Sequence, residues 1–154
     1  MERHWIRRAL MVAAIALAGP PPIARAAEPG FDLARYKGKV VYLDFWASWC
    51  GPCKFSFPFM TRLQSAYRDK GLVVVAVNVD HERARADLFL RQQNNTLLVV
   101  FDPKGEIATH FKVKDMPTSV LIDRTGRGRY VHEGFLQSKT PLYEQHIKEL
   151  LNEP

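Results

Sequence analysis

Residues 40–54 decide the fold, and they read Val-Val-Tyr-Leu-Asp-Phe-Trp-Ala-Ser-Trp-Cys-Gly-Pro-Cys-Lys. The first six residues are almost continuously apolar, which is typical of a strand buried on both faces. Apolar residues at helical spacing follow Cys53, so the two cysteines lie between a strand and a helix. A helix N-terminus presents unpaired N–H groups and the positive end of the helix dipole. We therefore expect the pKa of the Cys50 thiol to be lowered.

Cys50 and Cys53 are the two cysteines of the 154-residue chain. A secreted domain held together by disulfides usually carries more cysteines, spaced further apart. The pair therefore indicates redox chemistry, in which Cys50 attacks a substrate disulfide and Cys53 resolves the mixed disulfide. Half of a zinc site is the alternative, but zinc needs four ligands and the five histidines are scattered. We expect no metal and no other cofactor, because the cysteines carry the electrons.

The remaining pattern predicts an α/β domain with a central mixed sheet and helices on both faces. A strand over 72–79 completes a parallel strand–helix–strand unit with the first strand. The second half contains a turn at 102–105 and an antiparallel hairpin. The other expected elements are a helix over 80–93, a strand over 97–101, a helix or turn over 107–111, hairpin strands over 119–123 and 129–133, and a helix over 140–151.

The apolar residues of the two later helices predict which sides face the core. In the helix over 80–93, we expect Ala84, Leu88 and Phe89 to point inward. In the closing helix, the expected inner residues are Leu142, Ile147, Leu150 and Leu151.

Residues 1–26 have the pattern of a secretory signal peptide: a basic start, an apolar run over 9–19, and Ala24-Arg25-Ala26 before the cut. A retained membrane anchor is the alternative, but the run is much shorter than the ~20 residues that span a bilayer. We expect a domain over 27–154 in a periplasmic or secreted protein. Loss of 1–26, with four arginines and one glutamate, lowers the formal charge from +6 to +3. So small a charge gives little reason to expect nucleic-acid binding.

The stretch from Asp44 to Lys54 resembles the active-site segment of thioredoxins. The resemblance covers roughly residues 31–151, and three further features strengthen it. Pro58 matches the proline within the active-site helix, and Met116-Pro117-Thr118 matches the cis-proline loop. Gly134 matches the glycine after the last strand. The resemblance implies a thioredoxin fold whose cis-proline loop lies beside the cysteines and offers its backbone to a bound peptide. The substrate-binding residues implied are Trp49, Gly51, Pro52, Met116 and Pro117.

Within the thioredoxin superfamily, the chain resembles the secreted TlpA-like and ResA-like branch. The export signal and the long stretch 81–111, similar to the short central insertion of that branch, carry this resemblance. It implies a reductase of protein disulfides in the cell envelope, often of apocytochrome c, supplied with electrons by a membrane thiol carrier. We expect the protein to be a monomer. The chain departs from the branch at Ser56, where many members carry an acidic residue. Between the cysteines, Gly51-Pro52 resembles the sequence of the members that reduce disulfides. An oxidase or isomerase, or a non-catalytic binding or chaperone module, remains an alternative.

Asp44 is an acid in a buried strand shortly before Cys50. An isolated buried carboxylate is costly, so we expect a raised pKa. Its predicted role is to accept the proton of Cys53, the alternative being a solvated strand end. Thioredoxin pairs the equivalent acid with a lysine on the neighbouring strand, where this chain has Ala76. A further hypothesis is that Asp80, His81 or Glu82 supplies a second acid–base group. The alternative is that these residues are ordinary solvated loop charges, which are common.

The aromatic residues near the cysteines are assigned by their spacing. Trp49 is expected to be exposed and to contact partners. Trp46 either flanks the cysteines or only packs in the core. Phe55 and Phe59 are predicted to lie in the core, and Phe57 to be partly exposed.

Overall fold

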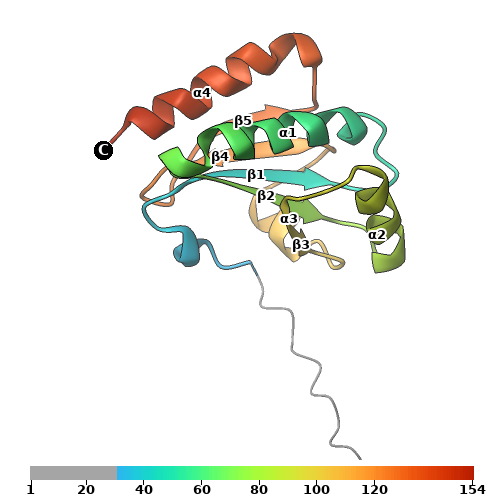
Figure 1. Ribbon diagram of the computed structural model, residues 1–154. Helices are drawn as coiled ribbons and strands as arrows, with labels where there is room; N and C mark the ends of the chain where they lie inside the picture. The colour runs from blue at the N-terminus through green and yellow to red at the C-terminus, as the bar shows by residue number, and fades with distance from the viewer. Residues whose placement is uncertain (1–30) are drawn as a thin grey trace, which may run out of the picture.

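A five-stranded mixed sheet with strand order β3-β2-β1-β4-β5 forms the centre of the molecule (Figure 1). The computed structural model describes residues 31–154. The strands are β1 (Val40–Trp46), β2 (Leu72–Asn78), β3 (Leu98–Phe101), β4 (Thr118–Ile122) and β5 (Gly128–Glu133). The helices are α1 (Cys53–Tyr67), α2 (Arg83–Gln92), α3 (Glu106–His110) and α4 (Thr140–Asn152), with 3-10 turns at Leu33–Tyr36, Arg68–Lys70 and Gln137–Lys139.

The two faces of the sheet bury different sets of residues, because alternate side chains of a strand point to opposite sides. Tyr42 and Trp46 of β1 point toward the layer of α1 and α4. Val41, Leu43 and Phe45 point to the other face, which α3 covers (Figure 1). The predicted α/β class with helices on both faces is confirmed.

Two helices orient their apolar residues differently from the prediction. α2 begins at Arg83 and buries Ala86 and Phe89, whereas Ala84 and Leu88 are exposed. Phe89 packs against the Trp46 ring, and a helix turns by about 100° per residue, so its neighbour Leu88 points to solvent. The expectation that Ala84 and Leu88 point inward was therefore wrong.

The same reasoning corrects α4. Leu142 is exposed, because Tyr143 takes the inward position beside Phe59. Ile147 and Leu150 are buried as expected, and Leu151 is half-buried.

The register of the sheet places polar residues in one row across it. Asp44 of β1 lies opposite Ala76 of β2 and opposite Ser119 of β4. Ser119 in turn lies opposite His132 of β5. These four residues from four strands lie at one level, below the cysteine-bearing end of β1.

Candidate active site

Cys50 and Cys53 form a disulfide, with their Cα atoms 5.4 Å apart, at the N-terminus of α1. The helix begins at Cys53 and its cap residue is Pro52, which has no N–H to leave unpaired. The N–H of Cys53 donates to Sγ of Cys50 over 3.3 Å. Cys50 retains 4% of its surface exposed and Cys53 none, so Cys50 is the more accessible of the two residues, as the order of attack and resolution requires.

The loop before the cysteines is held by Asp80, which follows β2 and is buried. Its carboxylate accepts hydrogen bonds from the N–H and the hydroxyl of Ser48, at 2.9 and 2.8 Å. Asn78 Nδ2 donates to the same carboxylate at 2.7 Å. Asp80 therefore positions the active-site loop, a role that the sequence did not reveal.

His81 and Glu82, the other candidates for a second acid–base group, are exposed. His81 Nδ1 lies 2.9 Å from the carbonyl oxygen of Pro103, and Glu82 pairs with Arg85 at 3.3 Å. Neither contact involves the cysteines, and the acid–base hypothesis for these residues stays a prediction.

The loop of Met116 and Pro117 lies at the same end of the sheet as the cysteines. Thr118, the residue after Pro117, pairs with Phe45 near the end of β1 that leads into the cysteine loop. The Met116–Pro117 peptide bond is cis, as the resemblance implied. The N–H of Gly134, at a φ of 72° that favours glycine, donates to the Pro117 carbonyl over 2.8 Å.

Asp44 is buried in β1, with Ser119 as its hydrogen-bond partner. The Ser119 hydroxyl donates to Oδ1 over 2.7 Å, and it also lies 2.8 Å from the Tyr42 hydroxyl. Oδ2 has no partner among residues 31–154. Burial raises the pKa of Asp44 to about 7, and the Ser119 hydrogen bond opposes part of that rise. The predicted raised pKa is confirmed, and Ala76 occupies the facing position as expected.

Sequence reasoning missed Ser119 and Tyr42 as partners of Asp44. The one signal available was a lone serine inside an apolar strand, immediately after the Met116–Thr118 motif. Such a hydroxyl needs a partner when it is buried. Its partner lies 75 residues away in the chain, so the pairing could not be read from local sequence.

The aromatic residues of this region correct two expectations. Trp49 is 68% exposed, as predicted, and Phe59 is buried. Phe55 is 65% exposed, whereas Phe57 is buried against Trp46, so both of these expectations were wrong. Because Cys53 faces inward, a residue two positions on is rotated by about 200° and points outward. Trp46 is fully buried and packs on Phe57 and Phe89, which favours the core interpretation.

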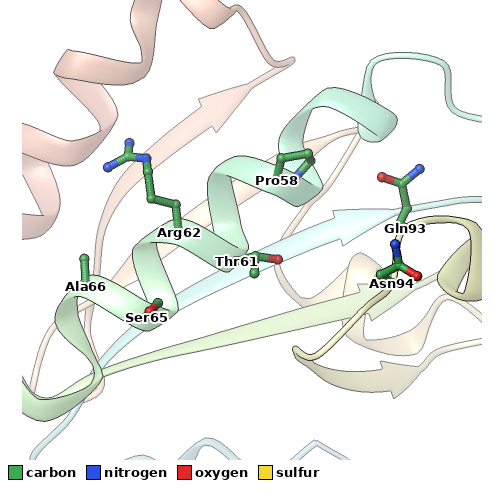
Figure 2. A pocket seen from close by; sticks show the side chains of 7 residues that line it. All are labelled: Pro58, Thr61, Arg62, Ser65, Ala66, Gln93 and Asn94. Atoms are coloured by element: carbon green, nitrogen blue, oxygen red, sulfur yellow. The ribbon is translucent and has the colours of Figure 1, made fainter.

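A surface hollow of about 590 Å³ lies elsewhere on α1, and neither cysteine lines it. Figure 2 shows Pro58, Thr61 and Ser65 on the helix, with Gln93 and Asn94 across from them. Arg62 also lines it, but its guanidinium pairs with Glu144 at 2.9 Å. We assign no chemistry to this hollow.

Within residues 31–154, no group of three or more His, Cys, Asp or Glu side chains is arranged to hold a metal ion. Among the same residues, no helix is both long enough and apolar enough to cross a bilayer. The expected signal peptide over 1–26 lies outside the described residues.

Comparison with known proteins identifies the family. The Redoxin family model matches residues 24–147, which is most of the chain. The chain belongs to the Redoxin family. Within the thioredoxin superfamily, this Redoxin protein is ResA-like.

The sequence relatives of this Redoxin protein include thiol-disulfide oxidoreductases named ResA. The protein from Bacillus thuringiensis subsp. konkukian is 36% identical over 96 residues, which cover 62% of this chain and 56% of the relative. The protein from Geobacillus kaustophilus is 30% identical over 118 residues, covering 77% of this chain and 67% of the relative. The chain thus spans little more than half the length of the first of these relatives.

Solved structures of thioredoxin-like proteins share the fold. A Chlorobium tepidum protein assigned as a thiol:disulfide interchange protein DsbE is 48% identical, with a TM-score of 0.76 over 78% of this chain and 85% of its own. The exposed lipoprotein thioredoxin Etrx1 of Streptococcus pneumoniae is 34% identical, with a TM-score of 0.63 over 77% and 90% of the two chains. The expected thioredoxin fold is confirmed.

Proposed function

We propose that this Redoxin protein is an extracytoplasmic thiol–disulfide oxidoreductase that reduces protein disulfides. The single observation that carries the proposal is the Cys50–Cys53 disulfide at the N-terminus of α1, with the buried acid Asp44 on the adjoining strand. The names of the ResA relatives and of the DsbE structure support the same chemistry.

The reaction runs in two exchange steps. In the first, the thiolate of reduced Cys50 attacks one substrate sulfur, the substrate disulfide breaks, and a mixed disulfide forms. In the second, Cys53 loses its proton to Asp44 and attacks Sγ of Cys50. The bond between Cys50 and the substrate breaks, and both substrate sulfurs leave as thiolates, which take up protons from water. The substrate gains two electrons and the cysteine pair loses two.

Two features of the site suit these steps. The positive end of α1 and the N–H of Cys53 stabilise a thiolate at Cys50. An acid whose pKa is about 7 can both accept and return a proton near neutral pH. Exposed Trp49, Gly51 and Pro52 form the docking edge with the Met116–Pro117 loop, which supplies backbone to an extended substrate segment.

The direction of the reaction is tested by the reduction potential of the Cys50–Cys53 pair. A value near that of thioredoxin, about −270 mV, supports the reductase proposal. A value near about −120 mV would favour the alternative of an oxidase. Equilibration with glutathione or dithiothreitol buffers, read by mass spectrometry of the alkylated forms, gives this value.

The mechanism is tested by trapping. A Cys53→Ser variant should accumulate mixed disulfides between Cys50 and its partners, which mass spectrometry identifies. Cys50→Ser is the matched control and should accumulate none. A Cys50→Ser protein that retained its function would contradict the catalytic proposal and favour a binding or chaperone module.

The identity of the trapped partners, together with the N-terminal residue of the protein taken from cells, tests the proposals on location and partners. We propose that the protein is exported by a signal peptide cut after Ala26, acts as a monomer, and receives electrons from a membrane thiol carrier. Reduction of apocytochrome c before haem attachment is a proposed use. Adducts confined to cytoplasmic proteins, or a cell-derived protein that still begins at Met1, would contradict export with cleavage.

A further inference from the structure

Asp44 has no direct route for its proton to reach water. It is buried on every side, yet the proposed reaction requires it to gain a proton from Cys53 and lose it again in each cycle. The proton must therefore leave through neighbouring polar groups. Among residues 31–154, the one side chain that donates a hydrogen bond to Asp44 is Ser119, on the strand next to it.

A histidine pair lies on the far side of Ser119. Directly opposite side chains of an antiparallel pair have Cβ atoms about 4.5–5.5 Å apart, and Ser119 lies opposite His132. His132 is buried, and its Nε2 lies 2.9 Å from Nδ1 of His146 on α4. His146 is only half-buried, so it connects the interior with the surface.

The unpaired atoms of the interior lie in the same row. Among residues 31–154, Asp44 Oδ2 and His132 Nδ1 are two of the three buried side-chain polar atoms that have no hydrogen-bond partner. They flank Ser119 from either side, on β1 and β5. Buried polar atoms are rarely left without partners unless they have a functional role.

The groups around His132 keep it neutral. Burial, and secondarily the facing His146, lower the pKa of His132 to about 4. The Tyr143 ring packs on His132 and the Tyr130 ring stacks on His146, with centroids 4.5 and 3.9 Å apart. Glu149 on α4 accepts a hydrogen bond from the Tyr130 hydroxyl at 2.8 Å. A neutral imidazole can take a proton on one nitrogen and give one from the other.

We propose that Ser119, His132 and His146 form a proton path from Asp44 to the surface at α4. The path rests on the proposed function, because it serves the step in which Cys53 is deprotonated. Asp44 gives its proton to Ser119 Oγ. Ser119 and His132 Nδ1 are not hydrogen-bonded to each other in the structure, so the Ser119 side chain turns toward β5 before its proton passes to His132 Nδ1. The Nε2 proton of His132 then passes to His146 Nδ1, and His146 releases its Nε2 proton to water. One proton enters, one leaves, and no electrons move.

Both histidines act through Asp44 and are positioning residues. The test must therefore distinguish a loss of proton transfer from a loss of packing around the two rings. The reduced full-length protein is mixed with glutathione disulfide, and the lifetime of the Cys50–glutathione mixed disulfide is followed by acid quenching and mass spectrometry. His132→Phe keeps a ring in the stack but removes both nitrogens. His146→Ala opens a half-exposed space that added imidazole can enter. His110→Ala, exposed on α3, is the control.

We expect His132→Phe and His146→Ala each to lengthen the lifetime of the mixed disulfide about tenfold at pH 7. This effect is smaller than the rate enhancement that acid–base catalysis usually contributes. Imidazole should restore His146→Ala but not His132→Phe, and His110→Ala should match the unmodified protein. Unchanged lifetimes in both variants, or slowing of His146→Ala that imidazole does not relieve, would overturn the path while leaving the oxidoreductase proposal intact. If the unmodified protein formed no mixed disulfide, both proposals would fall together.

Discussion

The Ser119 hydroxyl donates a hydrogen bond to Oδ1 of Asp44 over 2.7 Å, across the antiparallel pair of β1 and β4. Asp44 faces Ala76 on its other side, so no cation from β2 offsets its burial. The serine is therefore the group that most directly stabilises the ionised form of this acid.

Replacing Ser119 with alanine is expected to raise the pKa of Asp44 above its value of about 7. The change removes a hydrogen bond to the charged form while burial still favours the neutral form. Carbon-detected NMR of the Asp44 carboxyl across pH 5–9 measures the shift. Ser65→Ala, at an exposed position of α1, is the control and should leave the titration unchanged. A pKa that fell in Ser119→Ala would show that the hydroxyl does not stabilise the carboxylate.

Asp44 should make the folded protein less stable as pH rises. Its pKa is about 7 when folded against 3.8 for a free side chain, so the folded state binds more protons between these values. The penalty is absent below about pH 4, grows up to about pH 7 and is constant above. Its upper bound is about 4 kcal/mol.

Asp44→Asn should remove this dependence and be the more stable protein at pH 8. Urea unfolding of the oxidised protein at pH 4, 6 and 8 measures the difference between the two. Parallel stability profiles for the variant and the unmodified protein would rule out a raised pKa at this position.

Phe55 and Phe57 form a matched pair on one helix turn. Phe57→Ala should lower the free energy of unfolding by about 3–5 kcal/mol, because it leaves a cavity beside the Trp46 and Phe89 rings. Phe55→Ala should change it by no more than about 0.5 kcal/mol, because the ring is mostly exposed. Denaturant unfolding of both variants measures this contrast, and equal losses would contradict the inward and outward assignment.

Asp80→Ala should loosen the loop that carries Cys50. It leaves the N–H and hydroxyl of Ser48 and the amide of Asn78 without their acceptor, at a cost of about 1–3 kcal/mol. Hydrogen exchange at the Ser48 amide should become faster, and turnover of a disulfide substrate slower. Asp87→Ala, on the outer part of α2, is the control and should affect neither. Unaltered protection of Ser48 would show that Asp80 does not hold the loop.

Local patterns were sufficient to predict the class of fold and the reactive pair. The alternation and runs of apolar residues predicted each strand to within a residue or two, and the Cys50–Cys53 spacing between a strand and a helix predicted the redox site. The predicted inward-facing residues of the helices were wrong where more apolar residues were available than one inner face could bury. The start of α1 at Cys53 decides that Phe57 points inward and Phe55 outward.

The amino-acid sequence was enough to predict the disulfide, because its two cysteines are three positions apart. It was also enough to predict the burial of Asp44, because this residue lies in a short apolar run. Only the folded sheet decided the partners of that acid and of the loop. Ser119 lies 75 residues beyond Asp44, and Asp80 lies 32 residues beyond Ser48. Strand register sets such contacts, and register depends on how whole strands pair rather than on any local pattern.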